Sequence, residues 1–154
     1  MNNYKVFIAS SAELKHERGV LVDLLQDVND ELEEQGIKFR AELWEFMDSS
    51  MRAGRKEDEY LERLRQCEIC LVLFWRTLGE YTKEELDVAV EGMATGRFPK
   101  KVYVFYKMPD DGMSQELLIF KQEFSMCYPN LQSYTFEDSK TLRNLTKYIL
   151  TKDM

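Results

Sequence analysis

The chain has 154 residues, of which 44% are hydrophobic and 32% are charged, and it carries a formal net charge of −7. This size and composition predict one globular domain over residues 1–154, and the acidic balance argues against nucleic acid as a direct partner, because phosphate binding needs clustered Lys and Arg. No apolar run approaches the roughly 18 residues of a membrane span, and the N-terminus has no signal-peptide core, so we expect a cytoplasmic protein that does not bind membranes.

The first half of the chain predicts two strands and two helices. Residues 5–9 form a short apolar run, as in a strand buried on both faces. The helix that follows Ser10 opens with Ser10 and Glu13 in a capping box and ends at a glycine. Residues 37–43 alternate apolar and polar side chains, as an edge strand does, and a second helix covers about residues 57–66. The inward positions of the first helix are Leu14, Leu21, Leu24, Leu25, Val28 and Leu32.

The second half predicts three strands and three helices. Residues 69–75 and 102–106 are continuous apolar runs, whereas residues 131–136 alternate weakly and indicate a second edge strand. The three helices are predicted to open near Thr82, near Ser114 and after Ser139. In the last of them the inward positions are Leu142, Leu145, Tyr148 and Ile149.

Strands that alternate with helices and are joined by right-handed crossovers give a doubly wound α/β fold. With three inner and two edge strands, we expect a five-stranded parallel sheet in the order 2-1-3-4-5, with helices on both faces. The order reverses between strands one and three, and ligands bind at such a point. The crevice there is lined by Ser10 and Ser11 after the first strand and by residues 75–82 after the third. The loop over residues 46–55 is a candidate lid.

Three segments carry a resemblance to a known family. Residues 5–11 (KVFIASS), 43–45 (LWE) and 73–86 (LFWRTLGEYTKEEL) resemble the Toll/interleukin-1 receptor (TIR) superfamily, above all the TIR-like N-terminal effector domains of bacterial defence and NTPase-sensor proteins. The resemblance implies a flavodoxin-like sheet. It also implies either cleavage of NAD+ at the nicotinamide–ribose bond by a glutamate of the third helix, or an adaptor that self-associates. The family's aromatic residue followed by Glu-Leu falls on Tyr81 and Glu85-Leu86, whereas the candidate lid lacks the family's proline.

Two roles are open for Glu85. Thr82 and Glu85 fit a capping box, in which the carboxylate would only bind its own backbone. Alternatively, Glu85 is catalytic. Nicotinamide leaves NAD+ as a neutral molecule, so the reaction needs no general acid, and one carboxylate in a dry pocket stabilises the cationic, oxocarbenium-like transition state. Position at the crevice and the resemblance together favour the catalytic role.

Further residues around the crevice are candidates for binding the substrate. The hydroxyls and free amides after the first strand, at Ser10 and Ser11, are placed to cap the helix and to contact a pyrophosphate. Trp44 and Trp75, which end strands two and three, are candidates for stacking on a base or on the nicotinamide ring, although tryptophan more often packs in the core. Glu45 is a candidate for binding the ribose hydroxyls, Arg76 for binding phosphate, and Tyr81 for forming one side of the pocket. The whole set is Ser10, Ser11, Trp44, Glu45, Trp75, Arg76 and Tyr81.

Cysteine and histidine give no sign of a metal site or a bound cofactor. Cys67 and Cys70 form a lone CxxC with no matching second pair, and it leads into a strand rather than opening a helix, so we interpret both as core residues. The single histidine, His16, falls on the solvated face of its helix.

These observations favour an NAD+ glycohydrolase of the TIR type, a hydrolase or cyclase for which NAD+ is a substrate rather than a cofactor. We expect activity on self-association, in the effector domain of a bacterial immune or signalling protein that also carries a sensor or NTPase module. The first alternative is a non-catalytic TIR-like adaptor. The second is an enzyme like the nucleoside deoxyribosyltransferases, which also use a glutamate on a related sheet.

Overall fold

A computed structural model describes residues 2–42, 56–108, 110–131 and 133–152. Within these residues, five parallel strands form one sheet in the order β2-β1-β3-β4-β5, which confirms the predicted flavodoxin-like α/β fold. The strands are β1 (Asn2–Ser10), β2 (Ile37–Glu42), β3 (Ile69–Phe74), β4 (Lys101–Lys107) and β5 (Ser133–Phe136).

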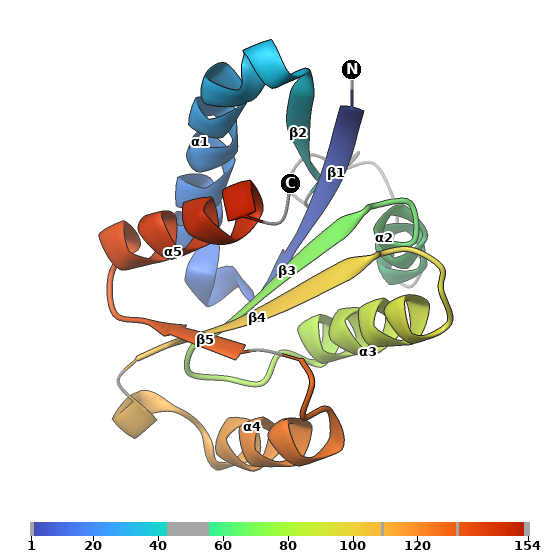
Figure 1. Ribbon diagram of the computed structural model, residues 1–154. Helices are drawn as coiled ribbons and strands as arrows, with labels where there is room; N and C mark the ends of the chain where they lie inside the picture. The colour runs from blue at the N-terminus through green and yellow to red at the C-terminus, as the bar shows by residue number, and fades with distance from the viewer. Residues whose placement is uncertain (1, 43–55, 109, 132, 153–154) are drawn as a thin grey trace.

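Helices cover both faces of this sheet (Figure 1). On one face lie α1 (Lys15–Leu32) and α5 (Ser139–Lys152). On the other lie α2 (Lys56–Leu64), α3 (Glu80–Ala94) and α4 (Gln115–Cys127). Short 3-10 turns precede α1, follow it and precede α4; they are η1 (Ala12–Leu14), η2 (Glu33–Gln35) and η4 (Asp110–Gly112).

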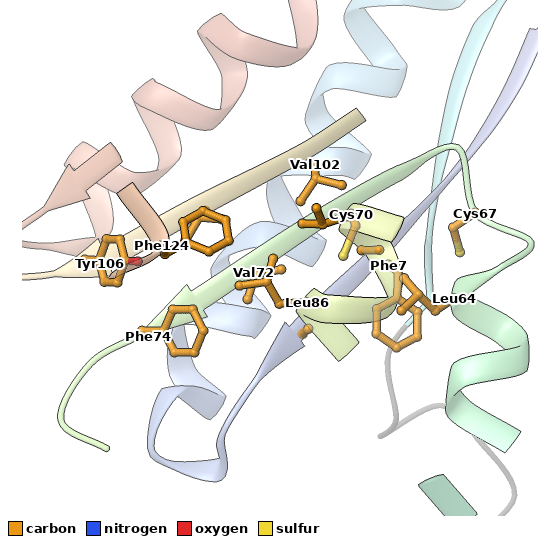
Figure 2. Packing of buried hydrophobic residues seen from close by; sticks show 14 of the residues in the cluster. Phe7, Leu64, Cys67, Cys70, Val72, Phe74, Leu86, Val102, Tyr106 and Phe124 are labelled. Atoms are coloured by element: carbon orange, nitrogen blue, oxygen red, sulfur yellow. The ribbon is translucent and has the colours of Figure 1, made fainter. Parts of the chain in front are cut away.

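The sheet divides the core into two layers. All six residues of β3 are buried, and successive side chains point to opposite faces because a strand has a period of two. Leu71 and Leu73 join the layer against α1 and α5, whereas Cys70 and Val72 join the layer against α2, α3 and α4. Figure 2 shows the second layer, in which Cys70 lies among aliphatic and aromatic side chains.

The edge strand β2 shows the predicted alternation over most of its length. Phe39 is buried toward α1, while Lys38 and Arg40 are exposed on the other side. The pattern breaks at the last residue, because Glu42 is buried although it shares a side with Lys38 and Arg40. Asn2 donates its amide to the carbonyl of Gly36, so β1 and β2 are held together from their first residues.

Two details of the helices differ from the sequence analysis. Tyr148 is predicted to face inward, but it is 60% exposed, and α5 instead buries Thr146 and Leu150 together with the predicted Leu142 and Ile149. The prediction for Tyr148 was wrong because the buried face of α5 passes through Thr146 and Leu150, and Tyr148 lies outside that face, in solvent. No helix in the described part of the chain is both long and apolar enough to cross a membrane.

Candidate functional site

The carboxyl ends of β1 and β3 lie side by side, and the start of α3 packs directly against them. Ser10 pairs with Leu73 in the sheet register. A methyl group at Gly79 would lie 3.2 Å from Thr82 Oγ1 and 3.5 Å from Ser11 Cβ, so the loop approaches both closely. The predicted crevice residues after β1 and before α3 are therefore neighbours.

Glu85 points inward from α3. Its side chain is on the buried face of the helix with Thr82 and Leu86, and the residue is only 6% exposed. The helix begins at Glu80, and its N-cap is Gly79, which makes no side-chain capping bond. Thr82 is thus the third helical residue and not the N-cap, so the capping-box interpretation of Glu85 was wrong.

Two buried cysteines, Cys67 and Cys70, have raised pKa values, and nearby carboxylates contribute to both shifts. Burial, together with the negative charge of Glu85, raises the pKa of Cys70 well above its usual value. Burial and the charge of Glu42 raise the pKa of Cys67 to about 12. Two carboxylates, Glu42 and Glu85, therefore lie close to the α2–α3 layer of the core. Among the residues that the structure describes, no three His, Cys, Asp or Glu side chains are grouped so that they could hold a metal ion.

Ser10 and Ser11 contact a buried arginine that the sequence analysis does not single out. Arg18 is 1% exposed, and its Nη1 donates to Ser10 Oγ at 2.6 Å and to the Ser11 carbonyl at 2.8 Å. The sequence does indicate that this arginine is buried, because Arg18 lies on the same helix face as Leu14 and Leu21 and so occupies a core position. The arginine fixes the end of β1.

Glu13 does not form the predicted capping box with Ser10. Ser11 is the N-cap of η1 and makes no side-chain capping bond. Instead, Glu13 Oε2 accepts hydrogen bonds from Ser11 Oγ at 3.0 Å, from the Thr77 amide at 3.1 Å and from Thr77 Oγ1 at 2.9 Å. The Arg76 amide also donates to it at 3.3 Å. The prediction was wrong because the loop after β3 offers this carboxylate more donors than the helix start does.

The structure places Trp75 on the opposite side of the sheet from Glu85. Its half-buried ring packs against the α1–α5 layer. The guanidinium carbon of Arg76 and Nζ of Lys107 each lie 3.9 Å from a Trp75 ring centroid, which leaves little of the ring face for a base. Lys107 Nζ also pairs with Glu17 Oε2 at 2.7 Å. Trp75 and Arg76 thus form a cluster separate from Glu85.

The other predicted contacts are placed less favourably or lie elsewhere. Tyr81 is 61% exposed on the outer side of α3. Trp44 and Glu45 lie outside the described residues. The structure therefore brings Ser11 close to the start of the helix that carries Glu85, and it does not bring Trp75 or Tyr81 to the buried side of α3.

Glu42 is a carboxylate that the sequence analysis missed. It is 8% exposed at the end of β2 and shares a row of the sheet with Phe7 and Cys70, all three on the α2–α3 side. Its sequence signal is weak, since an acid at the end of an edge strand is normally solvated.

Comparison with known proteins supports the fold. No protein-family model matches the chain, and no curated protein matches it. The structure is similar to the CMP N-glycosidase BcmB of Clostridium botulinum, with a TM-score of 0.51 and 16% identity over 94% of this chain and 98% of that one.

Two further solved structures are similar over most of their length. One is a de novo designed Rossmann 2x3 protein, with a TM-score of 0.45 and 17% identity over 97% of this chain and 90% of that one. The other is the Trp repressor binding protein of Bacillus subtilis, with a TM-score of 0.45 and 15% identity over 99% of each chain. The similarity to the Clostridium botulinum protein, at 16% identity, shows a shared fold.

Proposed function

We propose that this chain is a nucleotide N-glycosidase of the TIR type, which hydrolyses NAD+ at the nicotinamide–ribose bond with Glu85 as its catalytic residue. The observation that carries the proposal is the inward direction of Glu85, which is 6% exposed one turn below the contact between Gly79, Thr82 and Ser11. Doubly wound sheets bind ligands at the switch point, and α3 begins there, beside the end of β1.

The reaction needs only one acidic group from the protein. The bond between C1′ of the ribose and the pyridinium nitrogen breaks, and its electron pair leaves with nicotinamide, which becomes neutral. Glu85 stabilises the positive charge that develops on the ribose, an electrostatic effect on the order of 3–4 kcal/mol. Water then adds to C1′ and loses a proton, which gives ADP-ribose. As proposed, NAD+ is the substrate and no cofactor takes part.

Two comparisons support this class of reaction. The segment with Tyr81 and Glu85-Leu86 resembles the pattern around the catalytic glutamate of NAD+-cleaving TIR domains. The Clostridium botulinum protein, whose structure is similar over 94% of this chain, is a CMP N-glycosidase and so acts on an N-glycosidic bond of a nucleotide. We further propose that the domain is cytoplasmic, that it acts when copies associate, and that it serves as the effector of a bacterial immune or signalling protein.

The Clostridium botulinum enzyme also favours a second candidate, an N-glycosidase of a nucleoside monophosphate such as CMP. Glu85 would play the same part in it, because the ribose again becomes cationic as the bond to the base breaks. Cytosine, however, carries no positive charge before it leaves. This reaction would therefore need a proton donor to the base, which NAD+ cleavage does not.

A substrate comparison separates these candidates. The chain, fused to a protein that forms stable oligomers, is incubated with NAD+ and with CMP, and the released bases are measured by chromatography. We expect nicotinamide from NAD+ and no cytosine from CMP. Cytosine release without nicotinamide would favour the second candidate. No release from either nucleotide at any state of assembly would contradict both and favour the adaptor.

A further inference from the structure

A groove of about 590 Å³ runs along the outer edge of β2, between α1 and α2. Its volume lies within the range of small-molecule sites, roughly 300–1,000 Å³. Val22, Leu25 and Ala41 supply an apolar part of the lining, while a charged part is supplied by Asp30, Lys38, Arg40, Glu42 and Arg63. We call this feature the β2 groove.

The central main-chain groups of this edge are already occupied. The side chain of Asn29 donates from Nδ2 to the carbonyl of Phe39 at 2.8 Å, and Asn29 Oδ1 accepts from the Phe39 amide at 2.6 Å. An added strand from a partner would need the same amide and carbonyl, because it binds an edge through its main chain. Asn29 therefore blocks strand addition at the middle of β2, and the groove suits a small molecule instead.

Its charges indicate an anionic ligand with hydroxyl groups. Three cations, Lys38, Arg40 and Arg63, line the groove against two carboxylates, Asp30 and Glu42. The groove therefore has an excess of positive charge in a chain whose net charge is −7. Arginine binds phosphate through two parallel N–H groups. Glu42 adds a mostly buried carboxylate, with Oε1 3.7 Å from Arg40 Nε, and an ionised carboxylate accepts hydrogen bonds from hydroxyls.

We propose that the β2 groove is a binding site for a ribonucleoside phosphate. The cations hold the phosphate, Glu42 accepts the ribose hydroxyls, and the apolar wall against α1 receives the base. This site is distinct from the one around Glu85. The residues that line the groove come from α1, β2 and α2, whereas Glu85 lies on α3. The inference therefore does not rest on the proposed catalytic activity.

Isothermal titration with AMP tests the site, with adenosine and 2′,3′-dideoxy-AMP as matched probes. We expect AMP to bind at least tenfold more tightly than either. Arg63→Gln, an exposed substitution, should weaken AMP binding about tenfold and leave adenosine binding unchanged. Glu42→Gln should weaken AMP but not dideoxy-AMP, and should thus reduce the preference for ribose. Arg97→Gln, an exposed arginine on the turn after α3, is the control and should change nothing.

Glu85→Gln separates this inference from the proposed function. Binding of AMP that survives Glu85→Gln and is weakened by Arg63→Gln supports the β2 groove, whether or not the protein cleaves NAD+. The inference is overturned if AMP does not bind, if Arg63→Gln has no effect, or if Glu85→Gln abolishes binding. In the last case the nucleotide occupies the candidate active site. Unfolding temperatures of all variants show whether each remains folded.

Discussion

The carboxylate of Glu13 accepts hydrogen bonds from the amide of Thr77 at 3.1 Å and from its hydroxyl at 2.9 Å, although the two residues are 64 positions apart. This contact ties the first turn after β1 to the loop that leads into α3. Glu13→Ala removes the acceptor, so we expect the free energy of unfolding to fall by about 1–2 kcal/mol. Urea denaturation measures it, with Glu34→Ala, an exposed acid, as the control. Equal midpoints for the two variants would show that Glu13 does not hold the loop.

The contact between Arg18 and Ser10 gives a second prediction. Ser10→Ala removes the hydroxyl that lies 2.6 Å from Arg18 Nη1, and the guanidinium is too deeply buried for bulk water to replace it. We expect a loss of about 1–2 kcal/mol in the free energy of unfolding. Ser133→Ala on the exposed side of β5 should cost much less. A neutral result for Ser10→Ala would mean that the hydroxyl contributes nothing to holding the arginine.

The bidentate contact of Asn29 with Phe39 predicts a change in both stability and association. Asn29→Ala leaves the amide and carbonyl of an edge residue without their side-chain partner. We expect the free energy of unfolding to fall by about 1–3 kcal/mol and dimers to increase, because an open edge pairs with other strands. Sedimentation velocity measures the association, and Asn144→Ala, on the exposed side of α5, is the control. A variant that is as stable and monomeric as its control contradicts this interpretation.

The three cysteines should differ in reactivity. Cys67 and Cys70 are buried, whereas Cys127 is exposed at the end of α4. Because burial raises the pKa of Cys67 to about 12, its thiol stays protonated and unreactive near pH 8. A chromogenic disulfide reagent should therefore label one thiol quickly in the native protein, and Cys127→Ser should abolish that fast phase. Fast labelling that survives this substitution would contradict the packing.

The raised pKa of Cys67 also predicts how the stability of the protein depends on pH. The Cys67 pKa is about 12 in the folded chain against a usual value of 9.0, so the unfolded chain loses this proton first as the pH rises. Stability from this group is complete below pH 9 and declines toward pH 12. Urea midpoints measured across that window should fall less for Cys67→Ala than for the native sequence. Equal declines would show that this thiol does not titrate as proposed.

The sheet could be predicted because each strand carries a repeated pattern, either a continuous apolar run or an alternation of apolar and polar residues. The buried runs that became β3 and β4 and the alternation of Ile37, Phe39 and Ala41 set the inner and edge strands, and the order 2-1-3-4-5 followed. The direction of Glu85 was also predictable, since it lies four residues before Ala89, which is buried on the inner face of α3. Tyr148 was misplaced because helical spacing alone does not distinguish an aromatic residue on the core face from one at its margin.

Long-range polar contacts could not be derived from local patterns. Glu13 fits a capping box in sequence, yet its strongest donors come from Thr77, which only the folded sheet brings near. Arg18 was detectable as a charged residue at a core position, but its partners at the end of β1 were not. The burial of Glu42 could not be predicted because it depends on tertiary packing and not on the sequence of β2.

Release of nicotinamide from NAD+ by assembled Glu85→Gln protein, compared with assembled Glu84→Gln protein, tests the central claim most directly. The two glutamates are adjacent on α3, but Glu85 is buried and Glu84 is exposed. If the carboxylate of Glu85 stabilises the cationic ribose, Glu85→Gln should slow release by roughly 10²–10³-fold, and Glu84→Gln should release nicotinamide at nearly the native rate. Equal rates in the two variants, with both proteins folded, would contradict the assignment of Glu85.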